Sequence, residues 1–335
     1  AEEAAEEAAE EAGALAVLEA ELPQAEKIVE NIERVIVGKR EVIELLSIAL
    51  ICRGHVLIED VPGVGKTTLA GALAKSVSGR LKRIQFTPDV LPSDLTGFSM
   101  YNQKTGEFEY KAGTLSGEFI LADEINRTSP KTQASLLEAM EERQVTVDGV
   151  TYKMPKTFMV LATQNPVDYL GTFPLPEAQM DRFLMKVSIG YPSVRDEERM
   201  LAKYKEDNPL HTLQPVISSE ELLQIQEQVS KIYVEESLYS LIVEIVRQTR
   251  VHKDVLLGVS PRGALSLLHA AQGLAFFNGR DYILPDDIIK MAPYVLSHRI
   301  QLKHEAKLRN KANEDIIHYI LEEIRLPKVK AYAEK

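Results

Sequence analysis

The chain has little of what marks several common protein classes. Its single cysteine, Cys52, excludes an internal disulfide framework and is typical of a reducing compartment, so we expect a cytoplasmic location. Because Cys52 lies in an apolar stretch, we expect it in the core and not as a nucleophile. No apolar run approaches the roughly 18 residues that cross a bilayer, and no signal-peptide pattern is seen, so we expect no membrane insertion. The seven histidines form no H-E-x-x-H motif or Cys/His cluster, so we expect no zinc site.

The composition is that of a globular protein long enough for two domains with cores of their own. Of the 335 residues, 45% are apolar and 27% are charged, and the net charge is −11. Residues 1–22 are a low-complexity Ala/Glu-rich segment, and residues 1–12 carry six glutamates without a basic residue. The remaining chain has a net charge of about −5, and this mild acidity argues against a mainly electrostatic nucleic-acid binder.

The clearest motif is a phosphate-binding loop. Residues 60–67 read Asp-Val-Pro-Gly-Val-Gly-Lys-Thr and follow the apolar run His-Val-Leu-Ile at 55–58. The backbone N–H groups of such a turn, and of the helix after it, point at one spot and cradle phosphate oxygens. Lys66 would reach the β- and γ-phosphates, and the Thr67 hydroxyl would ligate Mg²⁺. Asp60 replaces the first glycine of the general motif, and its carboxylate would repel phosphates unless it points away.

Short apolar segments alternate with helical ones through the first half of the chain. This pattern predicts a mainly parallel sheet with helices on both faces, in which ligands bind beyond the carboxyl ends of the strands. We predict strands at 55–58, 81–86, 118–122, 157–163 and 185–189.

Two inserts interrupt this α/β unit. Residues 92–117 form a glycine-rich loop with aromatic residues between the glycines, and a loop of that length is usually functional. Residues 144–154 alternate apolar and polar positions around Asp148-Gly149, which predicts a two-residue hairpin. Passive surface decoration is the alternative for both inserts.

From residue 192 onward the pattern is helical. Apolar stripes at helical spacing lie near 194–206, 218–232, 235–250, 261–277 and 285–297, and Ser218 with Glu221 predicts a capping box. We therefore expect an α/β nucleotide-binding core over residues 23–191 and a small all-α lid domain with its tail over 192–335.

Two adjacent carboxylates end a predicted buried strand. Asp123 and Glu124 follow Phe-Ile-Leu-Ala at 119–122 and should point in different directions, because side chains alternate along a strand. Asp123 suits Mg²⁺ held through water, and Glu124 suits positioning and polarising the attacking water. A helix cap is the alternative for such a pair when it stands alone.

Three further residues fit roles around a triphosphate. Asn165 ends a predicted strand and can bond the γ-phosphate or the water, although a turn asparagine before proline is common. Arg182 ends a short helix and either pairs locally, with Asp181 or Glu177, or reaches a neighbouring subunit's γ-phosphate. Arg262 starts a helix, where the dipole disfavours a cation, so an anionic partner such as ATP phosphate would resolve that cost.

Taken together and in this order, these motifs resemble the AAA+ ATPases, and among them the MoxR family. The resemblance covers about residues 24–300 and is carried by five stretches of sequence. They are 60–67, Leu-Ala-Asp-Glu-Ile-Asn-Arg at 121–127, Ala-Thr-Gln-Asn-Pro at 162–166, Glu-Ala-Gln-Met-Asp-Arg-Phe at 177–183 and Ser-Pro-Arg at 260–262.

The resemblance implies a role for each site residue. Glu124 and Asp123 would form Walker B, Asn165 would be sensor 1, Arg182 the arginine finger and Arg262 sensor 2. Nucleotide contacts would come from Val37, Gly38, Asp60, Val61, Pro62, Gly63, Val64, Gly65, Lys66, Thr67 and Thr68, with Mg²⁺ at Thr67 and, through water, at Asp123.

The resemblance also implies an assembly and a client. ATP would bind between the core and the lid of one subunit and be completed by the next, in a homo-oligomer that is typically a hexameric ring. The two inserts would line its pore and act on a protein client, often with a partner that bears a von Willebrand factor A domain. Three alternatives stay open: a metal-insertion motor like the magnesium-chelatase I subunit, a nucleic-acid motor, and a nucleotide-gated scaffold with incidental turnover.

Overall fold

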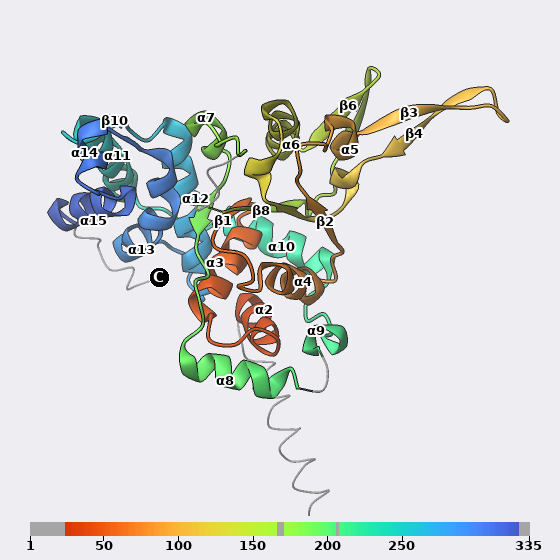
Figure 1. Ribbon diagram of the computed structural model, residues 1–335. Coiled ribbons are helices and arrows are strands. Elements are labelled where there is room, and N and C mark those ends of the chain that lie inside the picture. Colours follow the sequence, from red (N-terminus) through yellow and green to blue (C-terminus); the bar gives the residue numbers. More distant parts are fainter. Residues whose placement is uncertain (1–23, 166–170, 206–207, 328–335) are drawn as a thin grey trace, which may run out of the picture.

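A five-stranded parallel sheet forms the centre of the molecule. The computed structural model describes residues 24–165, 171–205 and 208–327 (Figure 1). The strands run in the order β2-β5-β8-β1-β9, and every neighbouring pair is parallel. They are β1 (Val56–Glu59), β2 (Leu81–Gln85), β5 (Phe119–Asp123), β8 (Met159–Gln164) and β9 (Met185–Val187). The expected α/β core is therefore confirmed, with each predicted strand within two residues of its observed bounds.

Alternation along the central strands divides the core between the two faces of the sheet. Leu57, Ile120 and Val160 pack with α6 (Pro130–Glu142) on one face. Val56, Phe119, Leu121 and Leu161 pack on the other face with α2 (Gln24–Glu33), α3 (Arg40–Ile51) and α4 (Lys66–Ser76). Because both faces are covered, β5 and β8 are buried almost throughout, which explains their continuous apolar sequence.

Both inserts are antiparallel hairpins. β6 (Gln144–Val147) and β7 (Val150–Lys153) form the predicted one, and its turn residues Asp148 and Gly149 have φ of 50° and 79°. The 92–117 insert holds α5 (Pro92–Thr96) and a second hairpin, β3 (Gly97–Asn102) with β4 (Glu107–Ala112), which projects far from the body (Figure 1). The rings of Tyr110 and Tyr152 stack with centroids 3.8 Å apart and join the two inserts.

The second half of the chain is helical, as predicted. Its helices are α8 (Val194–Lys203), α9 (Pro209–Thr212), α10 (Ser219–Val229), α11 (Glu236–Val251), α12 (Pro261–Phe277), α13 (Pro285–Leu296), α14 (His304–Leu308) and α15 (Asn313–Glu323). Ser218 and Glu221 form the predicted capping box. The lid also contains a short ribbon that no sequence pattern indicated, β10 (Val255–Leu257) with β11 (Gln301–Leu302).

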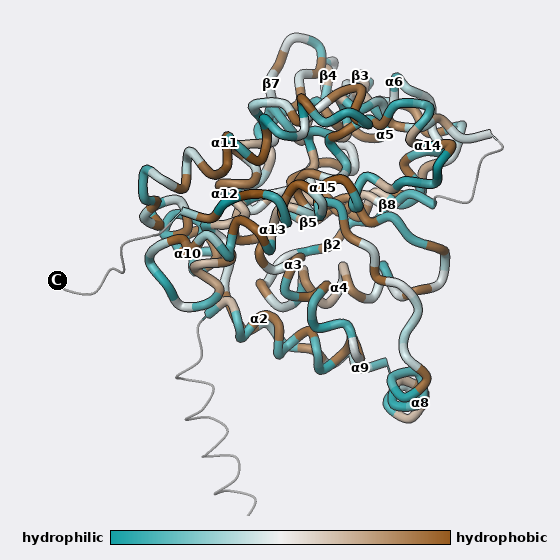
Figure 2. Tube along the Cα trace, turned by 90° about the vertical axis from the view of Figure 1, so that its left-hand side faces the viewer, coloured by the Kyte–Doolittle hydropathy of each residue, from teal (hydrophilic) through white to brown (hydrophobic). Residues whose placement is uncertain are grey.

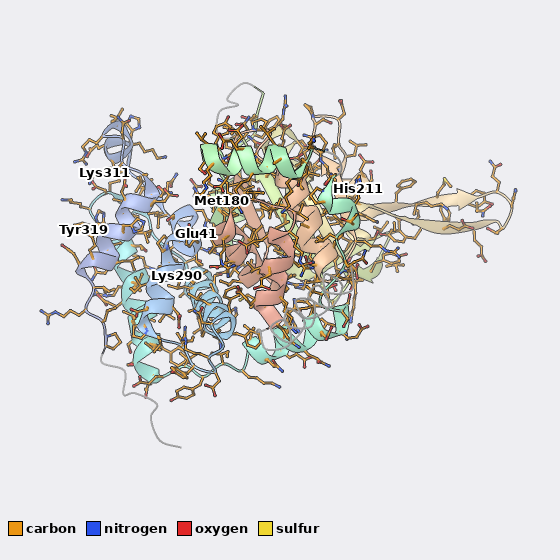
Figure 3. All side chains as sticks on the ribbon, turned by 90° about the horizontal axis from the view of Figure 1, so that it is seen from below. Glu41, Met180, His211, Lys290, Lys311 and Tyr319 are labelled. Atoms are coloured by element: carbon orange, nitrogen blue, oxygen red, sulfur yellow. The ribbon has the colours of Figure 1, made fainter. Side chains whose placement is uncertain are left out.

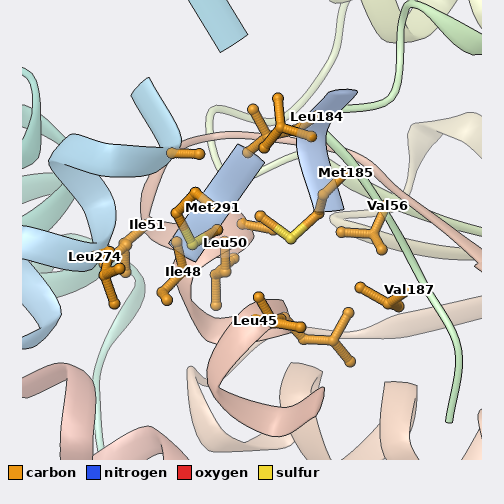
Figure 4. Close-up of a cluster of buried hydrophobic side chains, with 14 of the residues drawn as sticks. Leu45, Ile48, Leu50, Ile51, Val56, Leu184, Met185, Val187, Leu274 and Met291 are labelled. Carbon is orange, nitrogen blue, oxygen red and sulfur yellow. The ribbon is translucent and has the colours of Figure 1, made fainter. Parts of the chain in front are cut away.

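Core and lid share one continuous apolar cluster. Leu45 and Ile48 of α3, Met185 of β9, and Leu274 and Met291 of the lid helices all belong to it, and Figure 4 shows them together. The apolar segments run through the middle of the molecule, whereas α8 is largely hydrophilic and stands at its edge (Figure 2). From below, the lid side chains Lys311 and Tyr319 lie on the side opposite the long hairpin (Figure 3).

Two further expectations concern Cys52 and membrane-spanning helices. Cys52 donates to the His269 carbonyl at 3.2 Å, and burial raises the pKa of its thiol to about 12, so it is not a ready nucleophile. Among the described helices, none has the length and apolar content that crossing a membrane requires.

Stability should fall at mildly acidic pH because of buried His55. Its Nδ1 accepts from the Val160 N–H at 3.0 Å and its Nε2 pairs with the Met140 carbonyl at 3.1 Å, which fits only the neutral ring. Burial, helped by the nearby Arg143 charge, lowers the pKa of His55 to about 3. Below its ordinary pKa the unfolded chain takes up the proton first, so about 2 kcal/mol of stability is lost between pH 7.5 and 5.

Denaturant unfolding at pH 7.5, 6 and 5 measures this loss. His55→Gln keeps one donor and one acceptor but cannot titrate, so its free energy of unfolding should fall less with pH than that of the parent. Equal pH slopes for the two proteins would show that His55 does not contribute.

Candidate active site

The phosphate loop connects the end of β1 to the start of α4. Gly63 and Gly65 have φ of 88° and 90°, and a Cβ on either would meet no atom within 4 Å, so the loop backbone is open to a ligand. Lys66, the first residue of α4, donates from Nζ to the Asp60 carbonyl at 2.6 Å. Burial lowers the pKa of Lys66, against the opposing effect of nearby Asp60, Asp123 and Glu124. The loop thus has the geometry of a phosphate cradle.

Asp60, which departs from the general motif, points away from the loop. Its Oδ2 accepts from the backbone N–H groups of Ile189 and Gly190, at 2.6 and 2.7 Å, and from the Ser188 hydroxyl at 3.2 Å. Its Oδ1 accepts from the Val61 N–H at 2.9 Å. The carboxylate therefore anchors the connector between β9 and α8, and its lone pairs are used there and not against a phosphate.

The carboxylates at the end of β5 have separate surroundings. Asp123 accepts from the Thr163 hydroxyl at 2.6 Å and pairs with Arg83 at 2.6 Å. Glu124 lies in the left-handed region, with φ 56°, and accepts from Gln85 at 2.7 Å and from Arg127 at 3.2 Å. In this conformation both donors, one neutral and one cationic, reach the same carboxylate oxygen of Glu124, Oε2.

Sequence reasoning missed Arg83 and Gln85. Both lie on β2, the edge strand beside β5, where exposed polar residues occupy most positions. The sequence signal that could have pointed to them is the charged character of this predicted strand, because a strand buried on both faces would lack charged residues. Their contacts with Asp123 and Glu124 depend on the β2–β5 register, which pairs Gln85 with Asp123.

The end of β8 completes this edge of the sheet. Asn165 follows β8 and is 9% exposed, and its carbonyl accepts from the Asn126 side chain at 3.5 Å. Thr163, two residues earlier, also accepts from the Glu124 backbone N–H at 2.9 Å. Three strand ends therefore bring Lys66, the two acidic residues and Asn165 to one edge, as the parallel sheet predicted.

The loop at 37–38 lies beside the connector that Asp60 holds. Gly38 has φ 70°, and a Cβ there would approach the Asp196 carboxylate of α8 to 2.3 Å, so only glycine fits. Lys39 donates to the carbonyls of Ile189 and Tyr191 at 2.7 and 2.8 Å. The loop at 37–38, which we expect to contact the nucleotide, thus lies beside α8.

Arg182 and Arg262 lie close together at the edge of the sheet formed by the amino ends of the strands, opposite the phosphate loop. Both pair with Glu141 in the last turn of α6, Arg182 at 3.0 Å and Arg262 by a short contact. The neighbouring Met140 carbonyl bonds His55, just before β1, whereas the phosphate loop follows the far end of that strand. Arg182 pairs with neither of the local acids, Asp181 and Glu177, that were the alternative.

One expectation about Arg262 needs correction. We expected ATP between the core and the lid of one chain, with Arg262 reaching its phosphate, but the contact with Glu141 places Arg262 at the amino ends of the strands. The reason is that α12 docks beside α7 (Glu177–Met180), where Asp181 accepts from Ser260 at 2.8 Å. The helical periodicity of α12 carried no information about this docking.

Comparisons with known proteins show the family to which the chain belongs. Residues 55–185 match the ATPase family associated with various cellular activities (AAA), and residues 247–320 match an AAA lid domain. The chain is 40% identical to the chaperone MoxR1 of Mycobacterium tuberculosis, over 94% of this chain and 85% of that protein. It is 53% identical to the uncharacterized protein YeaC of Bacillus subtilis, over 91% and 95%. The chain belongs to the MoxR family of AAA+ ATPases.

A solved structure supports the fold of this MoxR-family protein. A putative ATPase from Cytophaga hutchinsonii superposes with a TM-score of 0.86 at 41% identity, over 91% of this chain and 95% of that one. The expected family is thus confirmed, whereas the roles of individual residues remain predictions.

The oxygen donors near the phosphate loop suit Mg²⁺. The side chain of Thr67 is exposed in the first turn of α4, and Asp123 is the acid at the end of β5. Hydroxyl, carboxylate and water oxygens are the ligands that this ion prefers. When bound, it would neutralise phosphate charge, and Asp123 would have to share its carboxylate between the ion's waters and Arg83.

Replacing Asp60 should destabilise the MoxR-family protein. Asp60→Asn substitutes an NH₂ donor for one of the oxygens that face N–H groups, and Asp60→Gly restores the general motif but leaves the connector without acceptors. Each should lose about 1–3 kcal/mol of unfolding free energy, because buried donors stay unpaired. Affinity for Mg–ADP should also fall, because the carboxylate holds the backbone of residue 60, whose carbonyl accepts from Lys66.

Thermal unfolding with and without Mg–ADP checks both effects. Asp89→Asn, at an exposed position, is the matched control and should behave as the parent does. An Asp60→Gly protein as stable as the parent would contradict the anchoring role.

Proposed function

We propose that this MoxR-family protein hydrolyses ATP at a site shared by adjacent subunits and uses the cycle to remodel a protein client. The observation that carries the proposal is the separation of the site across the sheet. Lys66 and Glu124 lie at the carboxyl ends of the strands, while Arg182 and Arg262 lie at the amino ends, bonded to Glu141. A neighbour's arginines must enter to complete the set that phosphoryl transfer uses.

Each residue at the carboxyl-end edge suits one part of that chemistry. Lys66 and the loop N–H groups would bind and orient the triphosphate, which supplies much of the rate through positioning. Glu124, whose Oε2 accepts from Gln85, would take the proton of the attacking water. Asn165 would orient that water or the γ-phosphate, and the incoming Arg182 and Arg262 would neutralise the charge that develops.

The inserts suit contact with a protein chain. On the projecting β3–β4 hairpin Phe98, Tyr101 and Phe108 are 49%, 52% and 74% exposed, which is unusual for aromatic side chains without a partner surface. β4 carries Glu107 and Glu109 beside Lys111, so the hairpin lacks the uniformly positive charge of a nucleic-acid contact. We infer a homo-oligomer, as a hexameric ring, that acts on a client, with a von Willebrand factor A domain protein as partner.

Glu124→Gln should bind ATP and arrest turnover. The amide keeps the shape of the side chain but cannot take a proton, so kcat should fall about 10²-fold or more while ATP affinity stays within about twofold. Steady-state ATPase and equilibrium ATP binding measure the two. Hydrolysis at the parent rate would remove Glu124 as the base, and the arrested protein, used as bait with ATP, would retain the client.

Arg182→Ala and Arg262→Ala should each spare nucleotide binding in the isolated chain and suppress ATPase. Losing a trans arginine costs about 10³-fold or more in kcat, because the developing phosphate charge is left without it. Arg195→Ala, on the exposed face of α8, is the control and should retain activity. Full ATPase in Arg182→Ala would contradict a shared site.

A further inference from the structure

Glu141 holds the two arginines that the proposed function sends to a neighbour. Its Oε2 lies 3.0 Å from Arg182 Nε, and its Oε1 makes a short contact with Arg262. We propose that Glu141 is a displaceable counter-ion: it occupies the arginine pair in the isolated subunit and gives way to the triphosphate of an adjacent one. This inference rests on the proposed function and names the group that regulates its assembly step.

The pairing depends on a junction that fixes both arginines at one place. Asp181 accepts from Arg299 Nε and from the Ser260 hydroxyl, both at 2.8 Å. Ser260 caps α12, which carries Arg262, and Asp181 is the residue before Arg182. The lid and the segment that carries Arg182 thus meet at the Asp181 carboxylate. This contact brings Arg182 and Arg262 within reach of one acceptor, Glu141.

Buried Arg299 extends this junction into the backbone around Arg182. It donates to the Phe183 carbonyl at 2.7 Å and the Leu184 carbonyl at 3.1 Å, and it is 4% exposed. Burial lowers its pKa to about 10, against the opposing effect of Asp181, so it remains charged at neutral pH. Arg182 of the core and Arg262 of the lid therefore form one unit, here called the arginine fork, and would meet a neighbouring subunit together.

The Glu141 contacts have the features of a pair that can be exchanged. The side chains of Arg182, Glu141 and Arg262 are 28%, 32% and 44% exposed, so water screens both pairs. Despite its short distance to Glu141, Arg182 Nε is a buried donor that lacks a well-directed hydrogen bond among the described residues. Glu141 also stands in the last turn of α6, where the helix dipole disfavours an anion.

A triphosphate is the better acceptor for this fork. Its terminal phosphate offers three oxygens and more negative charge than one carboxylate, and guanidinium groups bind phosphate in forked geometry. Until it arrives, Glu141 offsets the repulsion between the two arginines. Subunit association with ATP is therefore an exchange of anions, and the carboxylate opposes it.

Glu141→Gln tests the exchange directly. The amide retains an acceptor oxygen but removes the competing charge, so the protein concentration that gives half-maximal specific ATPase activity should fall by about three- to tenfold. Glu142→Gln is the matched control: the same helix, the same charge change, and an exposed side chain. An unchanged or higher half-maximal concentration in Glu141→Gln would overturn the proposal.

A spectroscopic experiment tests the counter-ion role of Glu141 separately from the proposed function. In nucleotide-free protein with ¹⁵N-labelled arginine, the Nε–H signals of Arg182 and Arg262, assigned with Arg→Lys variants, should shift in Glu141→Gln and stay in Glu142→Gln. Absence of that shift overturns the counter-ion even if the ATPase is concentration-dependent. If the Nε–H signals shift but the specific ATPase activity does not depend on protein concentration, the result would contradict the shared site. It would then also contradict the proposed exchange of anions.

Discussion

The polarity of the parallel sheet is the constraint on which the site depends. All five strands run the same way, so their carboxyl ends gather the phosphate loop, Asp123, Glu124 and Asn165 at one edge. The same polarity sends the segment before β9, which carries Arg182, to the opposite edge. Because α12 docks on that segment through Asp181, Arg262 follows. Under the proposed function, one chain therefore holds halves of two different sites.

Asp60 links the phosphate loop to the rest of the carboxyl-end edge. Its carbonyl accepts from Lys66, its backbone N–H donates to the Gln164 carbonyl at 3.2 Å, and its carboxylate holds the connector to α8. A glycine at this position would form the turn but none of the contacts of the carboxylate. The same connector receives Lys39, so the turn that faces the phosphates and the loop at 37–38 share one support.

Sequence reasoning reached the fold through patterns that are local. Apolar runs such as Phe-Ile-Leu-Ala at 119–122 indicate buried strands wherever they occur, and Asp148-Gly149 sets a turn through its own backbone preferences. The β3–β4 hairpin was not predicted because Phe98, Tyr101 and Phe108 face solvent, so no burial pattern marked the strands. The segments 1–23 and 166–170, which include the predicted acidic stretch and Pro166, lie outside the described residues.

The site was predictable where residues adjacent in sequence act together, and less so where distant segments meet. Lys66 and Glu124 follow from motifs, whereas the contacts of Gln85, Arg299 and Glu141 arise from packing between segments 39 to 121 residues apart. Periodicity predicted that α12 is a helix but carried no information on which surface receives it. The contact of Arg262 with Glu141 therefore differs from the expected position, whereas its role toward a phosphate stays a prediction.

A mixing experiment tests the central claim most directly. Glu124→Gln keeps its arginines but lacks the base, and Arg182→Ala keeps the base but lacks the finger, so each is expected to be nearly inactive alone. If the site is shared between subunits, an equimolar mixture should regain ATPase activity, since one variant supplies Arg182 to the intact Glu124 of the other. A mixture no more active than the sum of its parts, in material shown to co-assemble, would contradict the account.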